Sequence, residues 1–176
     1  AVRKQVIEEA AVIGATLSMT YMSTDLQVQQ YDALFIDEIS MAPLLPMFFA
    51  MGLVSSSCTL IGDFLQLPTI GTQSKNELLK KWHNRSFFDI IGMNSVGKAR
   101  SSEFVKPLSI QYRMNPAIAA IPNKLFYGDI LQSGDNTKTR VLSDQWVQDQ
   151  PLFLVDTSEG APWMNRGPNG QSRCNL

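Results

Sequence analysis

The chain has 176 residues, 44% of them apolar and 18% charged, with a formal net charge of −1. This composition is typical of a globular protein and excludes a disordered chain. The charge excludes a globally basic surface, so any nucleic-acid contact has to come from a local groove. Its two cysteines, Cys58 and Cys174, form no C-x-x-C pair, which argues against structural zinc and fits a cytoplasmic or nuclear protein.

The first part of the chain alternates segments expected to form helices with segments expected to form strands. Residues 2–9 place their apolar side chains on one helical face, and the small apolar residues 11–16 predict a buried strand. Residues 32–37 predict another strand, and residues 40–52 predict a helix. Pro46 within that helical segment predicts a late start or a kink.

A further strand is predicted at residues 58–62. About 20 residues of helix-compatible sequence separate it from the strand at 32–37, which predicts a parallel βαβ unit. Acidic residues follow both strands, Asp37 and Glu38 after the first and Asp63 after the second. Because open α/β sheets place ligands at the carboxyl ends of their strands, we expect a ligand site at this edge.

After residue 71 the chain changes character. Residues 76–82 and 86–91 predict two short helices, and the polar residues 92–103 predict a loop. Residues 108–111 predict a short strand, and the apolar segment 152–156 predicts a buried strand that opens a second domain.

Two helices are predicted between those strands. Asn115 can cap the first of them with Pro116 at its first helical position. Pro122 ends that helix and can start the next one, which Gly128 closes. The sequence contains no internal repeat and no low-complexity tract.

The adjacent carboxylates Asp37 and Glu38 suit a nucleotide bound with Mg²⁺. In that chemistry the first carboxylate holds the metal, usually through water, and the second lies beside the γ-phosphate to orient or deprotonate the attacking water. Acids that end a strand also serve as helix caps or as a solvated edge, and on its own the pair does not decide between these interpretations.

Two further residue types fit the same chemistry. The Gln66 amide can donate to a γ-phosphate oxygen while it accepts from the attacking water. Arg113, at a strand end between apolar neighbours, can stabilise the charge that develops on a transferred phosphoryl group. The alternatives are a polar loop after a strand for Gln66 and a surface salt bridge for Arg113.

In order and spacing, these elements resemble the superfamily 1 helicases, in the branch that contains the nonsense-mediated-decay RNA helicase. The resemblance covers most of residues 10–131. The matching segments are residues 34–38 (motif II), 60–63 with 66–68 (motif III), 111–116 with 126–128 (motif IV and its following helix), 12–16 (motif Ic) and 86–88 (before the hinge). A weaker match extends to Phe153, Val155 and Asp156 and to residues 172–175.

The resemblance implies an α/β fold of RecA type. Residues 1–107 would form the C-terminal part of a first RecA-like P-loop NTPase domain. Residues 108–176 would form the hinge and the N-terminal part of a second. ATP and Mg²⁺ would be the cofactors, and single-stranded DNA or RNA would be the partner of a motor driven by ATP hydrolysis.

The resemblance also implies roles at the nucleotide. Asp37 would coordinate Mg²⁺, and Glu38 would act as the catalytic base. Gln66 would sense the γ-phosphate and couple it to the nucleic-acid groove, and Asp63 would order that loop. Arg113 would reach the γ-phosphate from the hinge between the two domains.

Five more residues are implied in binding. Tyr112 would pack near the nucleotide base. The others would lie along the nucleic-acid groove and contact the sugar-phosphate backbone; they are Thr16, Ser18, Pro68 and Thr69.

The sequence departs from the family pattern at motif III, where Phe64 and Leu65 stand in place of a common Pro-Lys or Pro-Arg pair. The glycine-rich lysine loop that cradles phosphates is not found in the sequence, so we expect a fragment of a longer protein that binds ATP weakly by itself. Two alternatives stay open: a P-loop ATPase acting on a substrate other than nucleic acid, and a non-catalytic RecA-like scaffold in a nucleoprotein complex.

Overall fold

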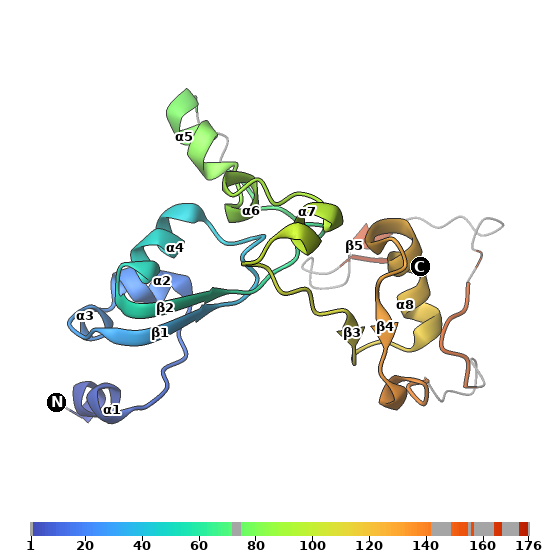
Figure 1. The fold of residues 1–176 in the computed structure, drawn as a ribbon, viewed down its shortest axis with the longest axis horizontal. Coiled ribbons are helices and arrows are strands. Elements are labelled where there is room, and N and C mark those ends of the chain that lie inside the picture. The colour runs from blue at the N-terminus through green and yellow to red at the C-terminus, as the bar shows by residue number, and fades with distance from the viewer. Residues whose placement is uncertain are drawn as a thin grey trace. The chain divides into compact units, whose positions relative to one another are not determined.

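The computed structural model describes residues 2–71, 75–141, 149–154, 156, 164–166 and 173–175. The chain divides into two compact units, Ala1–Pro107 and Leu108–Leu176. Figure 1 labels the elements of both units. The assignment of these units to two motor domains stays a prediction.

The first unit is built on two parallel strands. β1 (Tyr31–Ile36) pairs with β2 (Val54–Leu60) in the register Phe35 to Thr59 and Ile36 to Leu60. The connection between them is α4 (Leu44–Met51), and in Figure 1 α4 lies over one face of the strand pair. The predicted parallel βαβ unit and the α/β fold class are therefore confirmed, with β2 starting four residues earlier than expected.

A compact apolar cluster joins α4 to the strands. Its buried members are Ile36, Ile39, Ala42, Met47 and Ala50, and Met47 is completely inaccessible to solvent. The late start predicted from Pro46 is confirmed, since α4 begins only at Leu44. Proline is tolerated there because the first helical turn has no intrahelical partner for its backbone N–H groups.

The predicted strand at 11–16 is wrong. This segment has no regular secondary structure, and Val12 is 89% exposed. A strand needs a partner for its backbone groups, and no strand of the described residues pairs with this segment. Instead Thr16 caps the next helix, because its hydroxyl oxygen accepts from the Met19 N–H at 3.3 Å.

Three helices surround that segment in the chain. They are α1 (Val2–Glu9), α2 (Leu17–Met22) and α3 (Thr24–Gln27). α2 packs against both α3 and α4. The helix predicted at 2–9 is confirmed as α1.

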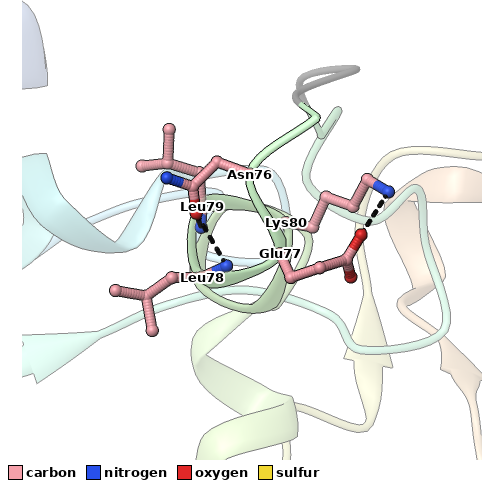
Figure 2. A network of polar contacts seen from close by, with 5 residues as sticks. All are labelled: Asn76, Glu77, Leu78, Leu79 and Lys80. Carbon is pink, nitrogen blue, oxygen red and sulfur yellow. Dashed lines mark hydrogen bonds and ion pairs between the residues drawn. The ribbon is translucent and has the colours of Figure 1, made fainter.

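The first unit ends in three short helices: α5 (Glu77–His83), α6 (Phe87–Ile90) and α7 (Val96–Ser101). The first two were predicted. Asparagine at position 76 caps α5, accepting from the N–H groups of Leu78 and Leu79 at 2.9 and 3.3 Å, as Figure 2 shows. The same view shows the exposed ion pair between Glu77 and Lys80, 2.8 Å apart.

The predicted loop at 92–103 is wrong, because α7 occupies its centre. Ser95 caps this helix by accepting from the Lys98 N–H at 3.3 Å. Ala99 is buried, with 5% exposure. A helix with only one buried alanine has too few apolar residues to show a helical periodicity in the sequence, and a serine cap adds no apolar residue to that pattern.

The second unit begins with two short parallel strands, β3 (Ile110–Gln111) and β4 (Gln132–Ser133). Between them lie α8 (Pro116–Pro122) and a π-helical turn, Asn123–Tyr127. The Asn115 cap is confirmed by its acceptor bond from the Ala117 N–H at 3.0 Å. The turn closes at Gly128, whose φ of 59° is the left-handed conformation that favours glycine.

The remainder of the second unit contains a 3-10 turn, Asp135–Thr137, and an antiparallel strand pair, β5 (Met164–Arg166) with β6 (Arg173–Asn175). The predicted strand at 152–156 is wrong over its described residues, because 152–154 and 156 carry no strand and Leu154 is 93% exposed. Residue 155 lies outside the described residues. Throughout the described ranges, every helix is too short or too polar to cross a lipid bilayer.

Gly62 is predicted to be essential for packing at the end of β2. A Cβ atom there would lie 2.8 Å from Ile39 Cγ1 and 3.0 Å from the Ile39 backbone nitrogen. Because backbone cannot move aside, Gly62→Ala should lower the free energy of unfolding by about 1–3 kcal/mol, measured by chemical denaturation.

Gly97→Ala is the matched control. Nothing lies within 4 Å of a Cβ atom at this position in α7. Alanine is favoured over glycine in helices by up to about 1 kcal/mol, so stability should stay equal or rise. Equal loss of stability in both variants would contradict the packing argument.

Candidate active site

The acid pair lies directly after β1 in an unusual backbone conformation. Asp37 and Glu38 are both exposed, and Glu38 has a φ of 55°, in the left-handed region. Such a conformation costs a non-glycine residue about 1–2 kcal/mol. The Asp37 carboxylate oxygen Oδ1 accepts from the Glu38 N–H at 2.9 Å, which offsets part of that cost and orients the turn.

The neighbouring strand end holds this turn on its other side. The Ile61 N–H donates to the Ile36 carbonyl at 2.8 Å, and the Ile39 N–H donates to the Ile61 carbonyl at 3.0 Å. These two bonds extend the parallel ladder past the ends of both strands. The structure thus places residues 37–38 next to residues 61–63, as the βαβ prediction required.

Asp63 organises the loop that follows β2. Its Oδ1 accepts from the Leu65 N–H at 2.9 Å, and its Oδ2 accepts from the side-chain amide of Gln66 at 2.9 Å. The Gln66 backbone N–H also donates to the Asp63 carbonyl at 3.1 Å. Gln66 is exposed but held by two bonds, so its amide is presented from an ordered turn at the same edge as the acid pair.

An aromatic contact supports this loop from α6. The ring centroids of Phe64 and Phe88 lie 5.6 Å apart at an interplanar angle of 76°. This edge-to-face geometry is favoured between aromatic rings. The apolar Phe64, a departure from the family pattern, therefore packs toward α6.

Thr69 is buried, with 8% exposure, and its hydroxyl points inward. It donates to the backbone carbonyls of Ser40, at 3.1 Å, and Ala42, at 3.3 Å. Ser40 is also buried, with 2% exposure, and its own hydroxyl has no hydrogen-bond partner among the described residues. An unsatisfied buried hydroxyl costs about 1–3 kcal/mol, so the turn after Glu38 carries two local penalties.

The remaining residues expected along a nucleic-acid groove are exposed in the first unit. Pro68 lies at the surface beside the buried Thr69. Thr16 and Ser18 are exposed at the start of α2, and the Thr16 hydroxyl keeps one lone pair free while it caps the helix.

The second unit presents Tyr112 and Arg113 directly after β3. Both side chains are exposed. The Arg113 carbonyl accepts from the guanidinium of Arg140 at 3.0 Å. A Cβ atom at Gly134 would clash with the Tyr112 ring, so glycine at this position lets the ring approach the backbone closely.

Gln111 belongs to the predicted motif IV segment but was given no role there, and in the structure it organises this turn. Its Oε1 accepts from the N–H groups of Arg113, at 2.9 Å, and Met114, at 2.7 Å. Its Nε2 donates to the Met114 carbonyl and to the Ser133 hydroxyl, both at 2.8 Å. A glutamine immediately before the Tyr112-Arg113 pair is the sequence feature that could have indicated a residue that positions this turn.

The donor set at the first strand end suits Mg²⁺. No cluster of three or more His, Cys, Asp or Glu side chains occurs in the part of the chain that the structure describes. Nucleotide-bound Mg²⁺, however, takes only one or two protein carboxylates together with phosphate oxygens and water. The exposed Asp37 offers such a carboxylate, so the residues present fit the metal.

Comparisons with known proteins agree with this arrangement. Residues 1–73 match one family model and residues 83–175 match a second, and both are described as an AAA domain. The second model covers more than half of the chain. The chain therefore belongs to the AAA-domain family, in the branch of superfamily 1 helicases expected from its motifs.

Named relatives are helicases. An uncharacterised ATP-dependent helicase of Methanocaldococcus jannaschii is 34% identical over 88% of this chain and 21% of its own length. Helicase sen1 of Schizosaccharomyces pombe is 33% identical over 76% of this chain and 8% of its own length. ATP-dependent helicase upf1 of the same yeast is 28% identical over 94% of this chain and 18% of its own length. The chain thus spans about a fifth or less of these relatives.

Gln111→Ala is predicted to destabilise the second unit. It removes four hydrogen bonds and leaves the N–H groups of Arg113 and Met114 without their acceptor. A net loss of about 0.5–1.5 kcal/mol for each hydrogen bond is expected, and denaturant unfolding measures it. Ser133→Ala is the control and should cost less than half as much, because Nε2 keeps its bond to Met114. Equal costs would contradict the role given to Oε1.

Proposed function

We propose that this chain is the part of an ATP-dependent helicase or translocase that carries the acid pair, the γ-phosphate sensor and an arginine finger. The observation that carries the proposal is the placement of residues 37–38 next to residues 61–63 at one edge of the parallel strand pair, with the Asp63–Gln66 turn following directly. The names of the relatives support ATP dependence and favour neither a scaffold nor another substrate class.

In this proposal the residues of the first unit divide the work on ATP. Asp37 holds Mg²⁺, which neutralises charge on the β- and γ-phosphates. Glu38 accepts the proton of the attacking water, because its carboxylate is exposed directly after Asp37 at the strand edge. Gln66 orients that water and the γ-phosphate with its amide, and Asp63 keeps the amide in place.

The second unit supplies the remaining groups. Arg113 stabilises the charge that develops on the γ-phosphoryl oxygens, and Tyr112 packs near the base of the nucleotide. Gln111 fixes the backbone at Arg113 and so directs the guanidinium. Residues 1–107 and 108–176 are, in this proposal, parts of two motor domains.

Single-stranded DNA or RNA is the proposed partner. Thr16 and Ser18 are exposed hydroxyls and Pro68 is an exposed ring, which suit contacts with sugar and phosphate. The buried Thr69 hydroxyl donates to the carbonyls of Ser40 and Ala42, so the proposal assigns this hydroxyl no nucleic-acid contact. The low cysteine content supports a reducing cytoplasmic or nuclear compartment.

Glu38→Gln in the full-length protein should abolish turnover and preserve ATP binding, since glutamine keeps the shape and cannot accept the proton. Loss of a general base lowers the rate by about 10²–10⁴, measured in a steady-state ATPase assay beside nucleotide titration. Asp32→Asn, which changes an exposed carboxylate on β1, is the control and should retain the parent rate. Normal hydrolysis by Glu38→Gln would refute the assignment.

Arg113→Ala in the full-length protein should lower kcat by roughly 10³–10⁵ with a much smaller rise in KM for ATP. An interaction that strengthens in the transition state affects kcat most. Arg113→Lys should recover little, because a point charge lacks the guanidinium fork. The assay uses saturating single-stranded nucleic acid, with thermal melting in parallel.

Arg100→Ala, which removes an exposed arginine on α7, is the matched control and should leave kcat unchanged. A surface salt bridge at Arg113 would instead give a stability change of about 1 kcal/mol or less with normal turnover. That result would overturn the finger assignment.

A further inference from the structure

Side chains hold the backbone of Arg113 at both of its polar groups. The Arg113 N–H donates to Gln111 Oε1 at 2.9 Å, and the Arg113 carbonyl accepts from Arg140 Nη1 at 3.0 Å. Gln111 belongs to β3, a strand of two residues, whereas Arg140 lies 27 residues further along the chain than Arg113. Because a side chain leaves the backbone in a direction set by its own residue, these two bonds constrain where the Arg113 guanidinium points.

The segment that carries Arg140, residues 134–140, is itself anchored. Thr137 is completely buried, and its hydroxyl donates to the Gly134 carbonyl at 2.6 Å. The Arg140 N–H donates to the Thr137 carbonyl at 3.1 Å, and the Gly134 N–H donates to the Gln111 carbonyl at 2.9 Å. The backbone of Arg140 therefore has a fixed place relative to β3.

A further bond joins this segment to the start of α8. The side-chain nitrogen of Asn115 donates to the Lys138 carbonyl at 3.2 Å, while its side-chain oxygen caps the helix. Residues 134–140 are thus bonded to Gln111, Arg113 and Asn115, which brackets the turn that bears Arg113. Of these three bonds, the one to Arg113 is made by a charged side chain.

The charge of Arg140 sets it apart from Lys138 in the same segment. Lys138 Nζ lies 2.8 Å from Asp135 Oδ1, so an acidic partner neutralises it. Within the described ranges Arg140 forms no ion pair, and its guanidinium is spent on the carbonyl of a second arginine. A hydrogen bond from a charged donor is stronger than one between neutral groups, which suits it to hold a backbone carbonyl at an exposed turn.

We propose that Arg140 is a positioning residue for Arg113. It holds the Arg113 carbonyl while Gln111 holds the Arg113 N–H, and together they direct the guanidinium toward the γ-phosphate. This inference rests on the proposed function. Arg140 acts through Arg113 and makes no contact with ATP. One N–H donor is enough for a carbonyl, so Arg140 does not need the fork geometry that Arg113 needs.

The experiment measures ATP hydrolysis by the full-length protein with saturating single-stranded nucleic acid. Arg140→Ala should lower kcat by about tenfold and leave KM for ATP within about twofold of the parent value, because a misdirected Arg113 affects the transition state most. Arg140→Lys should keep kcat within about threefold of the parent value, since an ammonium can donate to the same carbonyl. Lys138→Ala, which removes an exposed cation two positions away, is the matched control and should leave kcat unchanged.

A double-mutant cycle separates positioning from direct contact with ATP. In the Arg113→Ala protein, the addition of Arg140→Ala should change the single-turnover rate by less than about twofold, because no guanidinium is left to direct. A further tenfold loss in that background would show that Arg140 acts on ATP itself and would overturn the inference.

Thermal melting is measured for every variant. If Arg140→Ala lowers the melting temperature and keeps a normal kcat, its role is only structural and the inference alone is overturned. Equal slowing by Lys138→Ala overturns it as well. Should Arg140→Ala fail to fold, Arg140→Met, which keeps the aliphatic length, is judged by the same criteria. A normal kcat for Arg113→Ala, or a parent protein without ATPase activity, overturns the proposed function and this inference with it.

Discussion

The parallel pairing of β1 with β2 is the constraint on which the candidate active site depends. Parallel strands end at the same edge, and the ladder continues past both ends through the bonds that join Ile36, Ile39 and Ile61. Two loops that are more than 20 residues apart in sequence are thereby held at hydrogen-bonding distance. The roles proposed for Glu38 and Gln66 at the γ-phosphate require the two loops to keep a fixed position relative to each other.

This pairing is secured by packing beneath it. α4 buries its apolar side against the strands, and Ile39 is almost fully buried at the point where the first loop begins. Gly62 lets the second loop approach Ile39 closely. The chemistry-bearing residues are exposed while the residues between them are buried, so the site is rigid at its base and accessible at its rim.

The second unit also has to hold an exposed side chain, that of Arg113, but its strands are much shorter. A strand of two residues cannot hold a side chain in place by its ladder alone. A single side-chain amide, that of Gln111, closes the turn at Arg113 and Met114 and also ties it to Ser133 on the neighbouring strand. A half-buried amide can bond to several backbone groups at once. One glutamine can therefore hold the backbone of this turn in place where a longer strand ladder would otherwise be needed.

The sequence by itself determined the βαβ unit, the helix cap at Asn115, and the identity of the motifs, because each depends on local pattern or on residue type at fixed spacing. It failed at 11–16 and 152–154, where apolar composition resembles a strand and only pairing decides. Only the tertiary structure showed that Thr69 turns inward and that Gln111 organises its turn. A side-chain hydrogen bond joins residues that are distant in sequence, and its existence depends on the relative placement of two backbones, which no local pattern encodes.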